Sequence, residues 1–228
     1  MRETEKILII DTETANSVED GLCYDIGFII ADRHGRIYET RSYCIYDIFV
    51  LEADLMKTAY YANKLPLYYE GLDNGTYTLA TLFKVRREIA DLMTAYKVRK
   101  VFAYNCFFDK TMLNKTTRYI SKSACRFFFP YGTEFHDIWN FACSTICQTK
   151  SYKVFCEKND YISNRGRNYK ATAETVYQYL NGTPDFTERH QGLEDVKIEY
   201  AILLACYRTH KKVTTDIDRL CWRKVKRV

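Results

Sequence analysis

The feature that most constrains this chain is a run of four apolar residues, Ile7-Leu8-Ile9-Ile10, followed at once by the acidic residues Asp11 and Glu13. Such a run is typical of a buried strand. Because alternate residues of a strand point to the same face, the two carboxylates are expected to project together from the strand's end. Paired carboxylates are costly to bury unless a cation lies between them, and Mg2+ and Mn2+ prefer oxygen ligands. The alternative is that Asp11 caps a turn and Glu13 is simply solvated.

Two further acidic positions lie at the ends of other predicted elements. Asp109 follows a predicted strand over 98–104 and lies near the start of a helix that runs to about residue 120. The competing explanation for Asp109 is a helix N-cap or first-turn acid, which the helix dipole favours. His190 and Asp195 lie at the opening of a long C-terminal helix, so the histidine can lean over the carboxylate on the next turn. Four converging carboxylates can hold two hard cations, and a histidine can take a proton from an attacking water.

The order of predicted elements places these residues in an α/β framework. Strands over 7–10, 24–31 and 37–45 form an antiparallel meander, because turn residues separate the second strand from the third. Residues 47–63 show patchy helical spacing, and Pro and Gly mark 65–75 as a loop. The remaining predictions are a helix over 78–96, a strand over 98–104, a short strand over 133–137, and helices over 138–147 and 171–180.

The stretch 150–170 differs from the rest in composition. Its basic residues alternate with aromatic ones, and the turn Asn164-Arg165-Gly166 predicts a β-hairpin insertion. A groove for single-stranded nucleic acid uses such a mixture, with charges for phosphates and rings for bases. The candidate substrate-binding residues are therefore Lys150, Lys153, Arg165 and Arg167. An ordinary surface hairpin is the alternative.

Composition sets broader limits. The 228 residues suit one domain, here taken as 1–210, followed by a basic tail over 211–228 that is either disordered or a further phosphate contact. A net charge of +5 permits a polyanionic partner without requiring one. The nine cysteines include no CxxC pair, which favours reduced core thiols in a cytoplasmic protein. Neither a signal peptide nor a membrane-spanning stretch is recognised, so a soluble protein without membrane association is expected.

Taken in order, the motifs resemble those of the DEDD superfamily of 3′–5′ exonucleases, in its DnaQ-like, histidine-bearing subgroup (DEDDh). The resemblance covers about residues 6–208 and includes the helix opening Asp137-Ile138-Trp139. Three segments carry it: Ile10-Asp11-Thr12-Glu13, Tyr104-Asn105-Cys106-Phe107-Phe108-Asp109, and His190 with Asp195. The region near 186–204 is also similar to stand-alone exonucleases of bacteriophages. In that case the location would be the host cytoplasm.

The resemblance implies a ribonuclease H-like fold, with a five-stranded mixed sheet flanked by helices. It also implies two divalent ions, Mg2+ or Mn2+, with Asp11 bridging both, Glu13 and Asp195 completing one site, and Asp109 holding the second ion. His190 would be the general base. Nucleoside 5′-monophosphates would be released from the 3′ end.

Thr12 and Asn105 match positions that help to place the 3′-terminal nucleotide. Many relatives carry a Thr-Gly or similar pair after the glutamate, whereas Thr14-Ala15 stands here. The details of nucleotide stacking are therefore left open, while the metal ligands are unaffected. The basic stretch 150–170 is longer than in compact relatives and is expected to help select the substrate.

Three functional readings remain at this point. The preferred one is an exonuclease that acts on single-stranded DNA, alone or in association with a separate polymerase or replication protein. An RNA or tRNA 3′-end trimmer uses the same chemistry, because a metal site does not distinguish the sugar. A catalytically silent nucleic-acid-binding module of the same fold is the third reading, although all five expected catalytic residues are present.

Overall fold

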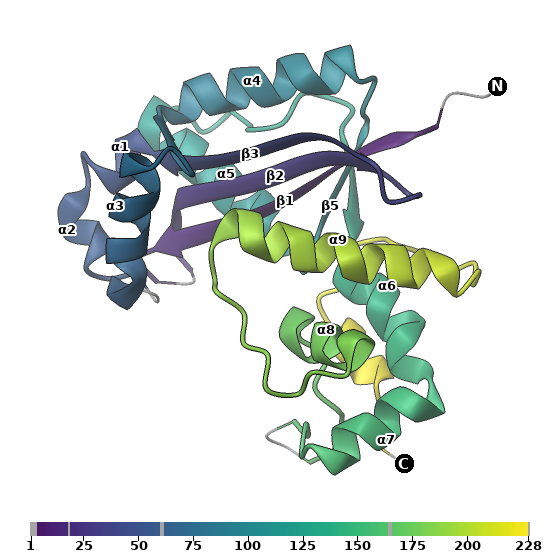
Figure 1. Ribbon diagram of the computed structural model, residues 1–228. Coiled ribbons are helices and arrows are strands. Elements are labelled where there is room, and N and C mark those ends of the chain that lie inside the picture. The colour runs from purple at the N-terminus through teal and green to yellow at the C-terminus, as the bar shows by residue number, and fades with distance from the viewer. Residues whose placement is uncertain (1–3, 18, 60–61, 164–165, 228) are drawn as a thin grey trace.

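The computed structural model describes residues 4–17, 19–59, 62–163 and 166–227. Their strands form one six-stranded sheet in the order β4-β3-β2-β1-β5-β6, flanked by helices (Figure 1). The strands are β1 Lys6–Ala15, β2 Leu22–Asp32, β3 Ile37–Ile45, β4 Thr78–Ala80, β5 Lys100–Ala103 and β6 Glu134–Asp137. Strands β1, β2 and β3 form the expected antiparallel meander, whereas β4, β5 and β6 each pair in parallel. The mixed sheet is confirmed, with six strands in place of five.

The additional strand is β4, which the sequence analysis placed inside a helix. Residues 78–80 pair with the end of β3, and helix α4 (Leu82–Ala95) begins only after Thr81. The Thr81 hydroxyl accepts a hydrogen bond from the backbone amide of Lys84, so it caps the helix. The apolar stripe of α4 was recognised, but the capping threonine that separates strand from helix was not.

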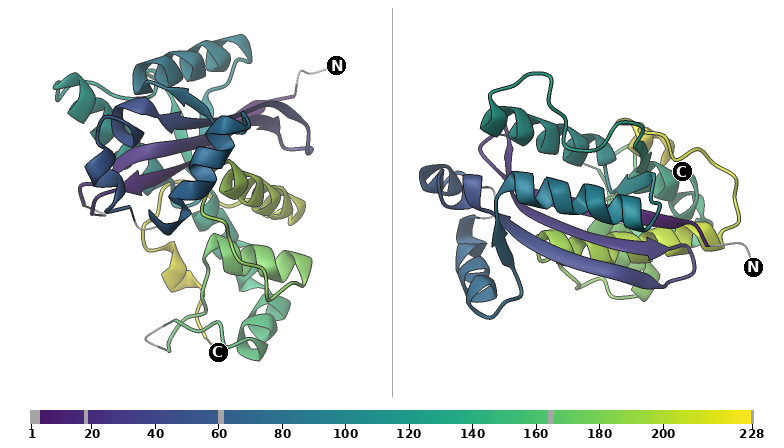
Figure 2. Two further views of the ribbon diagram at one scale, coloured as in Figure 1. Left: turned by 60° about the vertical axis from the view of Figure 1, so that its left-hand side comes forward. Right: turned by 90° about the horizontal axis from the view of Figure 1, so that it is seen from above.

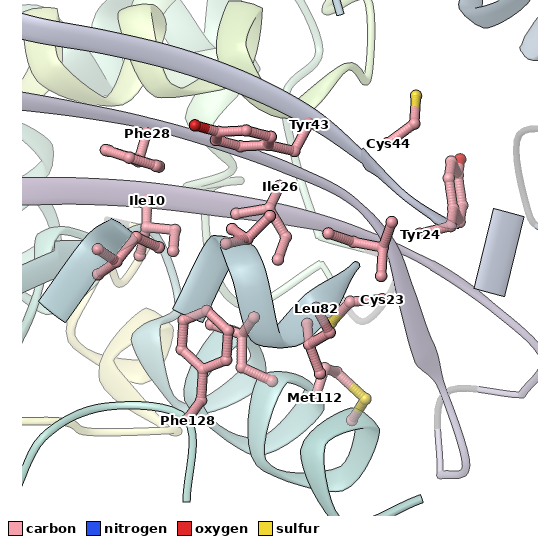
Figure 3. Packing of buried hydrophobic residues seen from close by; sticks show 14 of the residues in the cluster. Ile10, Cys23, Tyr24, Ile26, Phe28, Tyr43, Cys44, Leu82, Met112 and Phe128 are labelled. Carbon is pink, nitrogen blue, oxygen red and sulfur yellow. The ribbon is translucent and has the colours of Figure 1, made fainter. Parts of the chain in front are cut away.

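The two faces of the sheet are covered by different helices. Helices α4 and α5 (Cys106–Ser121) pack on one face, and α6 (Ile138–Ser144) and α9 (Gly192–Arg208) pack on the other (Figure 1). Along β1, Leu8 and Ile10 join the first cluster and Ile7 and Ile9 join the second. Figure 3 shows Ile10 and its neighbours on β2 packed above Leu82, Met112 and Phe128. The same alternation assigns Asp11 and Glu13 to the face that α9 covers.

Three short helices gather at one end of the sheet, beyond the end of β3 (Figures 1 and 2). They are α1 Tyr46–Phe49, α2 Ala53–Met56 and α3 Leu65–Asp73, with a 3-10 turn at Ala62–Lys64. Helix α3 replaces the predicted loop over 65–75. Its Pro66 lies in the first turn, where a missing N–H breaks no helical hydrogen bond. Gly71 faces Tyr77, and a Cβ there would lie 2.4 Å from the ring. Both breaker residues are therefore compatible with a helix at these positions.

The predicted β-hairpin insertion near 150–170 is wrong. Residues 150–158 form helix α7 (Lys150–Lys158), because Thr149 caps its start and Tyr152 and Cys156, one turn apart, are both buried. After this helix, Ile162 and Tyr169 form an isolated antiparallel bridge, and the Ser163 amide donates to the Asn168 carbonyl. Residues 164 and 165 of the predicted turn lie outside the described residues. Helix α8 (Ala173–Asn181) follows.

The basic C-terminal segment packs against the body of the protein. Cys221 and Val225 are fully buried in the cluster beneath α6 and α9. The side-chain amide of Asn168 donates to the Val225 carbonyl, and the backbones of Asn168 and Lys226 form an antiparallel β-bridge. The structure thus shows packing where the sequence suggested a disordered extension.

All nine cysteines are free, and all but Cys125 are buried, as expected for core thiols. Among the described residues, every helix is too short or too polar to cross a lipid bilayer.

Candidate active site

The acidic pair lies where β1 loses one of its two neighbours. Strand β5 pairs with β1 only at Leu8 and Ile9, whereas β2 remains paired along the strand to Ala15. Asp11 and Glu13 therefore lie within β1, not beyond its end as expected from the apolar run. The departure of β5 exposes one edge of β1, and this edge gives the two carboxylates access to a cavity.

Asp109 is brought to this edge by the junction between β5 and α5. Asn105 precedes the helix with a left-handed φ of 65°, which asparagine tolerates, and its backbone amide donates to the buried Asp137 carboxylate. This turn directs Asp109 toward β1. There the backbone amide and the hydroxyl of Thr12 both donate to Asp109 Oδ1, at 3.1 and 2.9 Å. Asp109 is thus a first-turn acid, and Thr12, the candidate nucleotide-binding residue, orients its carboxylate.

The start of α9 is fixed against β2 by two glycines. A Cβ on Gly27 would lie 2.1 Å from the backbone nitrogen of Leu193, so only glycine permits this approach. The fully buried Asp25 accepts a hydrogen bond from the Gly192 amide at 2.9 Å and from the Tyr68 hydroxyl at 2.8 Å. Asp25 therefore joins α3, β2 and α9 and sets the position of the residues at the start of α9.

Three of the predicted residues converge closely at this point. Ligand atoms of Glu13, His190 and Asp195 all lie within 4.8 Å of one another. His190 Nδ1 lies 3.9 Å from Asp195 Oδ2, and the histidine backbone has a left-handed φ of 51°. The strand contributes one carboxylate and the start of α9 contributes the other two groups. The mixed oxygen and imidazole set is one that divalent metals accept.

All seven residues that the motifs identified line one cavity of about 670 Å³. They are Asp11, Thr12, Glu13, Asn105, Asp109, His190 and Asp195. Apolar and aromatic surfaces from Phe108, Tyr104 and Trp139 complete the wall beside the acids. A cavity with convergent acids and ring surfaces can accept a nucleotide end.

The basic residues from 150–170 lie elsewhere. Lys150 and Lys153 project from α7 and line a separate cavity of about 490 Å³, together with Glu157 and Tyr169. Arg167 is exposed on the segment that follows, and Arg165 lies outside the described residues. The structure therefore separates these candidate substrate contacts from the acidic cavity.

Comparison with known proteins relates this architecture to a group of nucleases. No protein-family model matches the sequence, and no curated protein matches it. Solved structures do match. A full-length 3′-exonuclease shares 15% identity at a TM-score of 0.59, over 90% of this chain and 82% of the other. A 3′-exonuclease that recognises a histone mRNA stem-loop shares 13% sequence identity at a TM-score of 0.55, over 91% of this chain and 84% of the other. The zinc-bound complex of E. coli ExoI with ssDNA shares 14% sequence identity at a TM-score of 0.55, over 92% of this chain and 42% of the other.

The chain has the ribonuclease H-like fold of these exonucleases. The fold implied by the sequence motifs is thereby confirmed. The roles of the individual site residues of this ribonuclease H-like chain remain predictions. Their burial, charges and hydrogen bonds indicate the chemistry that each can perform.

Burial and mutual repulsion dominate the electrostatics of the site. Burial raises the pKa of Asp11 well above its usual value, and the charges of Asp109 and Glu199 raise it further. Burial, with smaller contributions from neighbouring acids, raises the pKa of Glu13 to about 9 and that of Asp195 to about 7. Burial also raises the pKa of Asp109 to about 7, although the hydrogen bonds from Thr12 oppose it. These carboxylates can ionise together only with nearby positive charge.

The oxygens of this site fit a divalent cation. Asp11 Oδ2 and Asp195 Oδ1 are buried and have no hydrogen-bond partner among the described residues. Buried carboxylate oxygens normally have a hydrogen-bond donor or a metal ion as partner. The site therefore carries the acidic oxygen cluster that hard divalent ions require, around the face of β1 that α9 covers.

His190 is suited to act as a base. Burial, with the charge of Lys64, lowers the pKa of its imidazole below the usual value. The Lys64 ammonium donates to the backbone carbonyl of Arg189, next to this histidine. A neutral imidazole at pH 7 can accept a proton.

Sequence reasoning missed three ionisable groups of the site: Lys64, Glu188 and Glu199. Glu188 and Glu199 line the cavity, and burial raises the pKa of Glu188 to about 8. Lys64 comes from a segment more than a hundred residues from α9, so no local pattern indicated it. Glu199 did leave a signal, because it follows Asp195 by four residues in a helix and interrupts an apolar stripe.

Proposed function

We propose that this chain is a metal-dependent 3′–5′ exonuclease of the DEDDh type. The observation that carries the proposal is the convergence of Glu13, His190 and Asp195 within 4.8 Å, beside Asp11 and Asp109 in one cavity of an exonuclease fold. Two other proteins with this fold are 3′-exonucleases, and one of them recognises a histone mRNA stem-loop.

The proposed roles follow the positions of the residues. Asp11, Glu13, Asp109 and Asp195 would hold the divalent ions, because their carboxylates line one cavity. When bound, two such ions stabilise the attacking and the leaving oxygens of a phosphodiester. Thr12 donates two hydrogen bonds to the Asp109 carboxylate and thereby keeps this proposed metal ligand in position.

His190 takes the proton of the attacking water. Its lowered pKa keeps the imidazole neutral and able to accept a proton near pH 7. Asp195 Oδ2 lies 3.9 Å from His190 Nδ1, so the Asp195 carboxylate can stabilise the imidazolium that forms. The water oxygen bonds to the phosphorus, and the bond from phosphorus to the 3′ oxygen of the next nucleotide breaks. That oxygen takes a proton from solvent and becomes the new 3′ hydroxyl, and a nucleoside 5′-monophosphate is released. Tyr104, Phe108 and Trp139 offer ring surfaces for the terminal base.

Single-stranded DNA is the proposed substrate, with RNA 3′ ends as the second candidate. One matching protein is described in complex with ssDNA and another in recognition of an mRNA stem-loop. The two candidates differ only in the sugar, which the acidic cluster does not distinguish.

A single experiment tests the chemistry and the sugar. Two 5′-labelled oligonucleotides of the same sequence, one DNA and one RNA, are incubated with the protein and Mg2+, Mn2+ or EDTA. Stepwise shortening from the 3′ end with either metal, and none with EDTA, is the expected result. Shortening of neither strand with either metal would leave the nucleic-acid-binding module as the better reading.

The basic residues of α7 supply a separate prediction. In the double variant Lys150→Gln/Lys153→Gln, single-stranded DNA should bind more weakly, and the slope of log K against log salt should flatten by about 1.4. Fluorescence anisotropy at several salt concentrations measures both. The matched control is Lys84→Gln/Arg87→Gln, two exposed charges on α4 across the sheet. Equal slopes in the two variants would show α7 to be an ordinary surface. The same comparison applies to Arg165→Gln/Arg167→Gln.

A further inference from the structure

Glu199 is a buried carboxylate without a full set of partners. Only 3% of the residue is exposed, and its Oε2 has no hydrogen-bond partner among the residues that the structure describes. Helix α9 otherwise turns apolar residues toward the sheet here, with the buried Val196 and Ile202 on either side of Glu199. Burying a carboxylate in this way is costly without compensation. The position therefore favours a charged or hydrogen-bonding partner beyond those that the described residues supply.

The side chain is aimed at the proposed metal centre. Glu199 follows Asp195 by one helical turn, and it lines the same cavity as Asp11 and Asp109. The backbone of Tyr104 hydrogen-bonds to its carboxylate, which places Glu199 at the junction between β5 and α5 that also carries Asp109. Asp11 Oδ2, like Glu199 Oε2, is buried and unpartnered among the described residues. Two unpartnered oxygens from different elements thus meet in one cavity.

We propose that Glu199 is a fifth carboxylate of the metal centre, acting on the side of the site formed by Asp11 and Asp109. This inference rests on the proposed function and deepens it. The Glu199 carboxylate would raise the affinity of the centre for the more weakly bound of its two ions. Glu13 and Asp195, with the proposed base His190 beside them, form the other side of the site.

A structural role alone makes a different prediction. If Glu199 served only to accept the hydrogen bond from Tyr104, its carboxylate charge would be unnecessary, because a glutamine carbonyl accepts the same bond. The variant Glu199→Gln preserves size and this acceptor and removes only the charge. It therefore separates a metal-directed role from a packing role.

The test is a Mn2+ titration of the protein without substrate, followed by electron paramagnetic resonance of the free ion. Wild-type protein should bind two ions. In Glu199→Gln, the weaker of the two affinities should fall by about tenfold or more, as for other groups that support metal ligands. The matched control is Glu157→Gln, an exposed carboxylate of α7 that lines the separate cavity, and its Mn2+ affinities should equal those of the wild type.

Several outcomes are decisive. Two unchanged Mn2+ affinities in Glu199→Gln would overturn the inference while leaving the proposed function intact. A wild-type protein that binds no Mn2+ would instead overturn the proposed function itself.

The melting temperature of metal-free Glu199→Gln should equal or exceed that of the wild type, because a buried charge is removed. If this variant does not fold, Glu199→Asp takes its place. Its shorter side chain withdraws the carboxylate and should weaken the second affinity, so an unchanged affinity would again contradict the inference.

Discussion

Replacing Asp11 by asparagine is expected to lower the rate of 3′-end hydrolysis by several orders of magnitude. Asp11 lies on the exposed edge of β1, in the cavity where Asp109, Glu13 and Asp195 converge. A neutral carboxamide would be a poor substitute for a carboxylate that holds divalent cations, so the proposed metal centre should be weakened. Single-turnover cleavage of a labelled DNA oligonucleotide in saturating Mg2+ measures the loss.

The same substitution should leave the fold intact. Burial and the neighbouring charges raise the pKa of Asp11 well above its usual value, so the metal-free protein gains little from this carboxylate. The melting temperature of metal-free Asp11→Asn should therefore match or exceed that of the wild type. Asp91→Asn, an exposed position on α4, is the control and should retain full activity. Near wild-type turnover in Asp11→Asn would rule out the assigned catalytic centre.

The second large effect concerns pH and metal. Within the proposed ligand set, the pKa values of Asp109 and Asp195 are raised to about 7 and that of Glu13 to about 9, and the pKa of Asp11 is also raised. In the unfolded chain they ionise at ordinary values, about 4. Between these values the folded protein binds more protons, so its stability must fall as pH rises. The metal-free melting temperature should drop by more than about 5 °C between pH 5.5 and pH 8.5.

Divalent metal should reverse most of this loss. Mg2+ or Mn2+ binds the ionised carboxylates of the folded state, so it should raise the melting temperature more at pH 8.5 than at pH 5.5. Calorimetry with EDTA, with Mg2+ and with KCl at matched ionic strength separates specific binding from screening. Part of the fall in melting temperature with rising pH should remain with metal bound. The reason is that Asp25, whose pKa burial raises to about 7, lies outside the proposed ligand set. A metal-free melting temperature that is flat or rises with pH would contradict the electrostatic account.

Much of the site was predictable because its motifs are local. The run that ends at Ile10 indicated a buried strand, and the period of two in strands placed Asp11 and Glu13 together. Asp109, His190 and Asp195 were recognised from their places at helix starts. The structure brings all five into one cavity, and the ribonuclease H-like fold that their motifs implied is confirmed.

Local patterns failed where a short element depends on distant packing. Strand β4 is three residues long and is held by β3, so its sequence could not distinguish it from the first turn of α4. Helix α7 was taken for a hairpin because its turn residues follow it, whereas burial of Tyr152 and Cys156 selects a helix. In each case contacts with residues far along the chain outweighed the local signal.

The sequence by itself determined which residues are candidates for the proposed chemistry, namely the acids and the histidine, and it identified the strand that presents two of the acids. Only the tertiary structure decided how they meet. It placed Thr12 against Asp109, 97 residues apart, and seated α9 on β2 through Gly27 and Gly192. It also turned Glu199 into the cavity. The physical reason is that residue type and spacing set chemistry and local periodicity, whereas burial, repulsion between carboxylates and close backbone approach arise only when distant segments pack together.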